Sequence, residues 1–268
     1  MPSIELAHAL STAAAIARGA GAILQEAGSD RAADFKLNEI DLVTEYDRRS
    51  EAFIVAALRE AFPDHALRAE EGSRANSGAE YEWVVDPLDG TTNFAHHLPI
   101  YSVVLALLHR GDPLIGVIFD PTRDEMFTAA KDEGAFLNGK PLRVSATRPL
   151  SRALLVTGFP YNIRTNPDNN IARFNHFALR ARAVRRLGSA ALDLAYVAAG
   201  RLDGYWESWL SPWDVAAGTL MVREAGGRVT NFDDVPVPVP NIGLVASNGL
   251  IHSEMLTVIR EGENAPKP

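Results

Sequence analysis

The sequence predicts a layered α/β fold, in which helices pack against the faces of β-sheets. Two helix-like segments open the chain, a stretch of short β-rich runs follows, and strands alternate with helices after about residue 145. The chain has 268 residues, of which 47% are hydrophobic, so it can bury a sizeable core as one unit or as two closely joined halves. We expect an N-terminal α+β half over residues 1–145 and a C-terminal α/β half over residues 146–268.

The first two elements are expected to be helices. Ser3–Ala27 carries Ala, Leu and Ile at helical spacing, and Gly28 directly after it is a typical stop signal. Thr44–Ala61 also has a helical pattern, and Thr44 with Asp47 resembles a capping box, although Glu or Gln is the usual partner.

Strands are expected to dominate from Trp83 to Val144. Short runs rich in β-branched and aromatic residues recur there, and Asn138-Gly139 after the last run is a strong signal for a hairpin turn. The expected strands are Trp83–Val85, Ser102–His109, Leu114–Phe119, Glu125–Ala129 and Ala135–Leu137.

Strands and helices are expected to alternate in the second half, which indicates an α/β organisation. The expected strands are Leu154–Thr157, Ala183–Arg186, Tyr205–Trp206, Arg228–Thr230 and Leu244–Ala246. The expected helices are Asn169–Arg182, Ser189–Ala199, Trp213–Ala225 and Ile251–Glu261.

The composition excludes several classes of protein and site. The chain has no cysteine, so disulfides and thiolate metal sites are excluded. Its seven His residues show no metal-binding spacing such as HExxH. A net charge of −8 argues against a general nucleic-acid binder. Neither a signal peptide nor a membrane-spanning stretch is recognisable, so we expect a soluble cytoplasmic protein without a membrane partner.

The most informative stretch of the chain is Trp83–Phe94, which places two carboxylates, a glycine and two hydroxyls after a short apolar run. Val84-Val85 should be buried, so Asp86 should emerge where the strand ends. Pro87 fixes the backbone and should prevent the strand from continuing. Asp89 follows three residues after Asp86, and a turn can bring both carboxylates to one side.

The rest of this stretch suits a phosphate group and a hard metal ion. Gly90 allows close backbone approach or a positive φ. Thr91-Thr92-Asn93 resembles a helix start, where free N–H groups favour a phosphate. Carboxylate and carbonyl oxygens are ligands that Mg²⁺ prefers. Asp-Gly is also a common turn, but a turn alone does not require the whole combination.

Other acidic residues have an ordinary structural interpretation when each is considered alone. Asp214 begins an Ala-rich helix after Pro212 and can be a helix cap. Glu70-Glu71 follows the β-like run Leu67–Ala69 and can be solvated, while Asp47 can cap a helix. Carboxylates gathered without a metal would repel a phosphate dianion, whereas divalent ions would reverse the local charge.

These residues resemble the motifs of the inositol monophosphatase family, which comprises Mg²⁺-dependent, lithium-sensitive phosphatases related to fructose-1,6-bisphosphatases. The family's first signature, W-x-x-D-P-[IL]-D-G-T-x-N-F, is matched by Trp83–Phe94, and its second, W-D-x-A-A-G followed by E-A-G-G, is matched by Trp213–Gly218 and Glu224–Gly227. Smaller matches keep the family's order: Asp41-Leu42-Val43-Thr44-x-x-Asp47, Glu70-Glu71, Gly188–Ala191 and Tyr205–Glu207. The resemblance covers roughly residues 5 to 260 and implies an αβαβα sandwich with its site between the two halves.

The resemblance also implies a set of metal ligands. Glu70, Asp86 and the Leu88 carbonyl would hold one Mg²⁺. Asp86, Asp89 and Asp214 would hold a second, and Glu70 would help a third, more hydrated ion. The cofactor would therefore be two or three Mg²⁺ ions, most of them held by the N-terminal half.

Further roles follow from the same resemblance. Thr91 and Asp47 would orient and deprotonate the attacking water, so the residues implied in catalysis are Asp47, Thr91 and Glu70. Glu207 would accept hydrogen bonds from substrate hydroxyls, and the residues implied in substrate binding are Gly90, Thr91, Ala190, Glu207 and Asp214. Lys36 matches a basic residue on a loop near the metals.

The implied activity is hydrolysis of the phosphate monoester of a small polyol by metal-activated water. Inositol 1-phosphate, giving inositol and phosphate, is the first substrate to expect. Fructose-1,6-bisphosphatase or a dual sugar phosphatase is an open alternative, and some relatives hydrolyse histidinol phosphate. A pocket that reads a phosphate and two hydroxyls separates polyols poorly, so the sequence leaves this choice open.

A partner is implied by a second feature, the basic cluster Arg180–Arg186 in an otherwise acidic chain. Some bacterial members of the family bind RNA polymerase or antitermination factors, and this cluster resembles theirs. Charge runs are usually a solvated helix end or part of a dimer interface, and either would also explain this cluster. The resemblance further implies a homodimer and lithium sensitivity.

Overall fold

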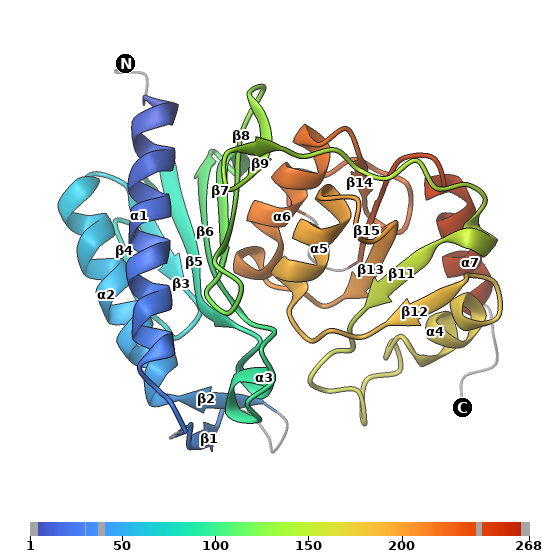
Figure 1. Cartoon of the computed structure of the whole chain (residues 1–268), viewed down its shortest axis with the longest axis horizontal. Coiled ribbons are helices and arrows are strands. Elements are labelled where there is room, and N and C mark those ends of the chain that lie inside the picture. The colour runs from blue at the N-terminus through green and yellow to red at the C-terminus, as the bar shows by residue number, and fades with distance from the viewer. Residues whose placement is uncertain (1–4, 30, 37–40, 240–242, 264–268) are drawn as a thin grey trace.

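The computed structural model describes residues 5–29, 31–36, 41–239 and 243–263, and it confirms the αβαβα sandwich (Figure 1). One outer helical layer contains α1 (Leu6–Gln25) and α2 (Glu45–Ala61). The middle layer contains α5 (Ala190–Ala198) and α6 (Pro212–Glu224), and the other outer layer contains α4 (Ile171–Ala178) and α7 (His252–Glu263). The two sheets lie between these three helical layers, and each is covered on both faces.

The larger sheet has the strand order β10-β9-β8-β7-β6-β5-β3-β4, and its neighbours are antiparallel except for β3 and β5. Its strands are β3 (Ala66–Ala69), β4 (Arg74–Ala75), β5 (Tyr81–Asp89), β6 (Ser102–His109), β7 (Asp112–Asp120), β8 (Glu125–Ala130), β9 (Gly134–Leu137) and β10 (Lys140–Pro141). A separate ribbon pairs β1 (Ala33–Phe35) with β2 (Leu42–Thr44), and the short helix α3 (Thr91–Ala95) follows β5.

The smaller sheet has the order β12-β11-β13-β15-β14, which leaves β12 and β14 at its edges. Its strands are β11 (Leu154–Thr157), β12 (Ala183–Arg185), β13 (Gly204–Ser208), β14 (Arg228–Thr230) and β15 (Gly243–Ser247). A turn of 3₁₀-helix, η1 (Leu150–Arg152), precedes β11.

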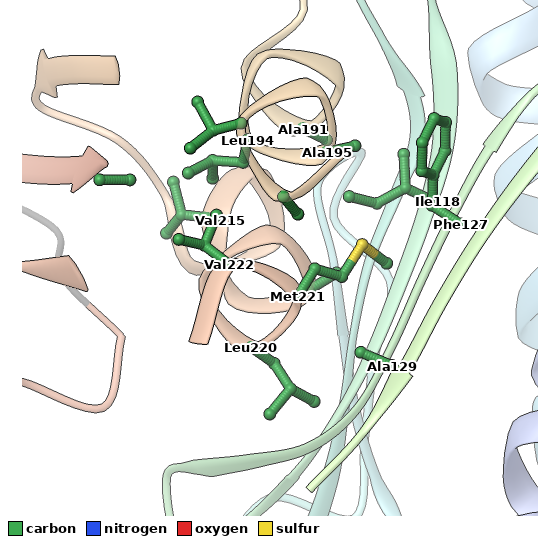
Figure 2. Close-up of a cluster of buried hydrophobic side chains, with 14 of the residues drawn as sticks. Ile118, Phe127, Ala129, Ala191, Leu194, Ala195, Val215, Leu220, Met221 and Val222 are labelled. Carbon is green, nitrogen blue, oxygen red and sulfur yellow. The ribbon is translucent and has the colours of Figure 1, made fainter. Parts of the chain in front are cut away.

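Side-chain alternation along the central strands builds two cores, one on each face of the larger sheet. Val84 and Val104 belong to the core that is shared with α5 and α6, whereas Val85 and Leu105 belong to the core under α1 and α2. In the shared core, Ile118 and Phe127 of the sheet lie against Met221 of α6 and Ala195 of α5 (Figure 2). Strands buried on both faces have few polar positions, so the polar residues at their ends stand out.

Most of the elements that the sequence predicts are present. α1 and α2 occupy the predicted segments, and the capping box of Thr44 with Asp47 is confirmed. The strand Ser102–His109 has the predicted bounds. The predicted start of the first helix at Ser3 lies outside the described residues. The sequence does not predict the strands β1, β2, β4 and β10, because each is only two or three residues long.

Two local predictions are wrong. Pro87 does not end the strand, because β5 continues to Asp89 and the pairing register with β6 shifts between Asp86 and Asp89. A proline is tolerated at such an irregularity, where no ladder donor is needed. The helix predicted over Asn169–Arg182 spans only Ile171–Ala178. Asn170 adopts a left-handed φ of 68°, so the helix can begin only after it.

The predicted boundary near residue 145 falls in the connection between β10 and β11. Division of the chain into two halves there stays a prediction, since the core between the sheets draws on residues from both sides of it. Within the described ranges, no helix combines the length and the apolar character needed to cross a membrane.

Candidate active site

A cavity of about 430 Å³ gathers nearly all the site residues that the sequence predicts. It is lined by residues of β5, the N-termini of α3, α5 and α6, and the end of β13. The predicted residues on its wall are Lys36, Glu70, Asp86, Leu88, Asp89, Gly90, Thr91, Ala190, Glu207 and Asp214. Asp47 is fully buried directly behind this wall. Residues from before and after the predicted boundary near residue 145 thus line one cavity.

Asp86 and Leu88 lie on the last part of β5, where the pairing with β6 is irregular. The Leu88 N–H donates a hydrogen bond to Asp86 Oδ1 over 2.9 Å, which holds this buried carboxylate in place. Burial, followed by the negative charge of Glu70, raises the pKa of Asp86 well above its ordinary value. Asp89 and Asp214 act in the same direction, so these acidic groups lie close enough to repel one another.

Asp89 connects the end of β5 to the N-terminus of α5. Its Oδ2 accepts hydrogen bonds from the Ser189 hydroxyl at 2.6 Å and the Ala191 N–H at 2.8 Å. Its Oδ1 accepts one from the Ala190 N–H at 3.2 Å. Burial raises the pKa of Asp89 to about 6, while the hydroxyl of Ser189 and the helix N–H groups oppose the rise. The helix start therefore stabilises the charged form of Asp89.

Asp214 occupies the third position of α6 and closes a capping box with Ser211. The Ser211 N–H donates to Asp214 Oδ2 over 2.7 Å, and the other carboxylate oxygen is not needed for the cap. Burial and then the charge of Glu70 raise the pKa of Asp214 well above its ordinary value. The capping box accounts for an acidic residue at this position of the helix. Because Asp214 also lines the cavity, its second oxygen can serve as a ligand there.

Glu70 follows β3 and faces the same cavity, where Lys36 balances part of its charge. The Lys36 ammonium lies 2.9 Å from Glu70 Oε1 and also binds Glu71. Burial would lower the pKa of Lys36, but the two carboxylates raise it above its ordinary value. Burial raises the pKa of Glu71 to about 7, against the opposing effect of Lys36.

Thr91 and Asp47 form a hydrogen-bonded pair between α3 and α2. The Thr91 hydroxyl lies 3.0 Å from Asp47 Oδ1 and 3.1 Å from the Leu88 carbonyl oxygen, and it can donate to one of them at a time. Asp47 Oδ2 accepts from Thr44 N–H at 2.8 Å. Asp47 thus combines the capping role considered from the sequence with a contact to the cavity wall.

Gly90 makes the tight passage from β5 into α3. It has a φ of 98°, and a Cβ placed on it would lie 2.9 Å from the Ile100 carbonyl oxygen. Only glycine fits this conformation and this space. The N–H groups of the first helical turn have no acceptor within α3, so they are the groups that an anion would meet there.

Glu207 of β13 also lines the cavity and is held from two directions. The Tyr205 hydroxyl donates to its Oε2 over 2.6 Å. Gly158 lies against the carboxylate, since a Cβ at that position would be 2.1 Å from the same oxygen. Burial raises the pKa of Glu207 to about 7, and the Tyr205 hydrogen bond opposes this rise.

We call Glu70, Asp86, Asp89 and Asp214 the four-carboxylate group. The atoms that it offers a metal ion are all oxygens, and the charge of Glu70 raises the pKa of both Asp86 and Asp214, so a divalent cation such as Mg²⁺ would relieve their repulsion. As they stand, no three His, Asp or Glu side chains in the described part of the chain are arranged to hold a metal ion. The chemistry of the group fits Mg²⁺, but its side chains, Glu70 with its Lys36 contact among them, would have to shift to bind it.

The cavity also contains residues whose place in the site the sequence does not predict. Ser189 binds Asp89, Asp193 lies in the first turn of α5, and Arg186 had been considered only as part of the basic cluster. Tyr161 and Trp209 add aromatic surface, with exposures of 54% and 52%. Ser189 could be predicted from the sequence, because a hydroxyl residue at the start of a helix is a recognisable pattern. The other residues reach the cavity only through tertiary packing, which the sequence does not show.

Comparison with known proteins shows which sequences and structures this chain is similar to. A family model described as the inositol monophosphatase family matches residues 5–264. An inositol-1-monophosphatase of Synechocystis is 48% identical over 80% of this chain and 75% of its own length. A Nus factor SuhB of Pseudomonas aeruginosa is 48% identical over 82% of this chain and 83% of its own. The solved inositol monophosphatase of Anabaena (Nostoc) superposes with a TM-score of 0.87 at 44% identity, covering 98% of each chain.

Proposed function

The chain belongs to the inositol monophosphatase family, and on that basis we propose that it is a Mg²⁺-dependent phosphatase that hydrolyses the phosphate monoester of a small polyol. Inositol 1-phosphate is the first substrate we propose. The observation that carries the proposal is the meeting, on one cavity wall, of the four-carboxylate group, the Thr91 hydroxyl and Glu207. These supply, in turn, ligands for a cation, a position for water and an acceptor for substrate hydroxyls.

The four-carboxylate group would hold the cations. We propose that Glu70, Asp86 and the Leu88 carbonyl hold one Mg²⁺, that Asp86, Asp89 and Asp214 hold a second, and that Glu70 also contributes to a third. When bound, Mg²⁺ would offset the negative charge of protein and phosphate and would lower the pKa of a bound water.

Thr91 and Asp47 would position the attacking water and take up its proton. When the Thr91 hydroxyl donates to Asp47 Oδ1, its lone pairs remain available to accept a hydrogen bond from water. As the water oxygen attacks phosphorus and the bond from phosphorus to the alcohol oxygen breaks, the water proton can pass to Thr91 while the Thr91 proton passes to Asp47. The leaving alkoxide would take a proton from solvent. Burial raises the pKa of Asp47, which favours its acceptance of a proton, although hydrogen bonds from Thr44 oppose this effect.

The phosphate and the leaving alcohol would occupy opposite parts of the cavity. The N–H groups of Gly90 and Thr91, at the start of α3, would bind phosphate oxygens. Glu207, Ala190 and Asp214 would contact the polyol, and Glu207 is already held by Tyr205 in a position to accept from a hydroxyl. Positioning and charge stabilisation account for most catalysis in phosphoryl transfer, so no covalent nucleophile is needed.

The experiment that tests this proposal is phosphate release from inositol 1-phosphate and fructose 1,6-bisphosphate, with Mg²⁺, with EDTA and with added Li⁺. We expect release that requires Mg²⁺ and is faster with inositol 1-phosphate. A preference for the bisphosphate would move the protein to the sugar phosphatases or to dual specificity, and histidinol phosphate belongs in the same series. A folded protein that releases phosphate from none of these substrates would contradict the proposal.

A second candidate function is binding to the transcription machinery. The Pseudomonas relative is named a Nus factor, and this chain has an exposed basic surface at the edge strand β12. All four arginines of the cluster are exposed, but Arg180 is paired with Glu261 and Arg186 lines the cavity, which leaves Arg182 and Arg185. The free part of the cluster is therefore smaller than the sequence implies.

Binding to purified RNA polymerase, with and without antitermination factors, tests this candidate. Retention that is lost when Arg182→Ala is combined with Arg185→Ala would support it. The matched control combines Arg48→Ala with Arg59→Ala, which removes two exposed arginines from α2 on the outer helical layer. No retention of the unaltered protein would exclude this function.

Three further properties are proposed from the family alone: a cytoplasmic location, a homodimer and inhibition by Li⁺. Light scattering of the purified protein measures the second, and the Li⁺ series above measures the third. A monomer at micromolar concentration or Li⁺-insensitive turnover would remove the corresponding property.

A further inference from the structure

Asp193 is a cavity residue that the roles proposed above leave unused. It lies in the first turn of α5, its exposure is 1%, and it lines the same cavity as Glu207. Among the described residues, none donates a hydrogen bond to its Oδ1. Buried polar atoms nearly always have a partner, so an unpartnered oxygen on a carboxylate whose residue lines the cavity requires an explanation.

The surroundings of Asp193 do not supply the missing partner. Glu207 is fixed by the Tyr205 hydroxyl and by the close approach of Gly158, so it cannot swing freely toward Asp193. After burial, the charge of Glu207 is the largest influence raising the pKa of Asp193, and Arg186 acts in the opposite direction. Asp193, Glu207 and Arg186 therefore share one corner of the cavity.

We propose that Asp193 is a substrate-binding residue, which together with Glu207 forms a two-carboxylate group that binds adjacent hydroxyls of the leaving alcohol. The proposal rests on the phosphatase function proposed above. A hydroxyl can donate to a carboxylate and can also accept from a protonated carboxyl, so it satisfies Asp193 in either state. An anionic substituent would meet the two acidic groups there together with the guanidinium of Arg186.

The two-carboxylate group thereby gives the cavity a preference among substrates. A polyol with neighbouring hydroxyls can bind both residues, whereas a leaving group without hydroxyls leaves them unpaired. Sites built to hydrogen-bond a hydroxyl discriminate strongly against analogues that lack it.

The test compares two substrates, inositol 1-phosphate and p-nitrophenyl phosphate, which has no hydroxyl on its leaving group. We expect Asp193→Ala to lower kcat/KM for inositol 1-phosphate about 10- to 100-fold, mainly through KM, because a hydrogen bond to a charged group is lost. The same variant should change kcat/KM for p-nitrophenyl phosphate by less than about threefold, because that substrate makes no use of Asp193. Asp193→Asn keeps the shape and one acceptor, so its loss should be smaller, and it serves if the Ala variant does not fold.

Thr219→Val is the matched control, because the Thr219 hydroxyl is also buried and unpartnered among the described residues but lies outside the cavity. It should leave the ratio of the two activities unchanged. Calorimetric binding of inositol alone gives a second readout that does not require turnover. Loss of inositol binding in Asp193→Ala would support the inference, even if the wild type hydrolyses neither substrate. Absence of hydrolysis by the wild type would contradict only the phosphatase proposal. Equal effects of Asp193→Ala on both substrates, or inositol binding unchanged by it, would overturn the inference.

Discussion

The two carboxylate groups of the cavity contain the same kind of side chain in different environments. The four-carboxylate group gathers acids whose mutual repulsion is balanced in part by Lys36. In the two-carboxylate group, Glu207 has the Tyr205 hydroxyl as a donor, and Asp193 has an oxygen without a partner among the described residues. Accumulated charge suits a cation, whereas fixed and unsatisfied acceptors suit hydroxyls. Environment, more than residue type, therefore decides the proposed roles.

The largest expected effect comes from the four-carboxylate group. Asp214→Asn keeps the cap acceptor for the Ser211 N–H but removes a negative charge from the group. We expect turnover of inositol 1-phosphate to fall by at least about 1,000-fold, because a metal that stabilises the reacting phosphate would be lost. Steady-state phosphate release measures this, with Glu207→Gln as the comparison that should keep Mg²⁺ dependence. Near-normal turnover of Asp214→Asn at ordinary Mg²⁺ would show that the group is not the metal site.

A smaller loss is expected at Thr91, whose hydroxyl contacts Asp47. Thr91→Ala should slow kcat by about 100-fold, because the path for the proton to Asp47 is broken. Mg²⁺ affinity, measured by calorimetry, should not change. The neighbouring Thr92 is exposed, so Thr92→Ala is the matched control. An unchanged kcat in Thr91→Ala would remove this hydroxyl from the mechanism.

A variant that moves the Glu207 carboxylate but keeps the residue should lower activity by a still smaller factor. A Cβ at Gly158 would lie 2.1 Å from Glu207 Oε2, so Gly158→Ala must move the carboxylate. We expect kcat/KM for inositol 1-phosphate to fall about tenfold, while p-nitrophenyl phosphate is hydrolysed nearly as before. Thermal unfolding shows whether the variant remains folded. Equal losses with both substrates would mean that Glu207 does not read the polyol.

The smallest effect should be on the pH dependence of the free energy of unfolding. It distinguishes Asp89 of the four-carboxylate group from Glu207 of the two-carboxylate group. Burial raises the pKa of Asp89 to about 6 and that of Glu207 to about 7, above their ordinary values. A raised folded-state pKa gives stability that is present at low pH and is lost as pH rises through that pKa. Each residue should thus lower the free energy of unfolding by about 1–3 kcal/mol between roughly pH 4 and 7.

Mg²⁺ should remove the contribution of Asp89 to this pH dependence and leave the contribution of Glu207. The variant Glu207→Gln should then abolish what remains. Urea denaturation at a series of pH values, with Mg²⁺ and with EDTA, measures the free energy of unfolding and so gives both contributions. A pH dependence that Mg²⁺ does not alter would place the cation elsewhere.

The sequence predicts the layers well because the central strands are buried on both faces and bounded by clear turns. It misplaces the end of β5, since a proline within a register shift cannot be distinguished from a proline that ends a strand. In the site, Asp86 to Thr91 stand out because they are contiguous and follow a buried run. Asp214, Glu70 and Asp47 each have an ordinary structural interpretation, and only family resemblance assigned them a role. Asp193 was not recognised, because an unpartnered oxygen is a property of tertiary packing.

The measurement that tests the central claim most directly is calorimetric titration of Mg²⁺ into the wild type, Asp214→Asn and Glu207→Gln without substrate. We expect the wild type and Glu207→Gln to bind Mg²⁺ with similar affinity and Asp214→Asn to lose at least one binding event. Equal binding by all three proteins, or none by the folded wild type, would contradict the assignment of the four-carboxylate group as the metal site.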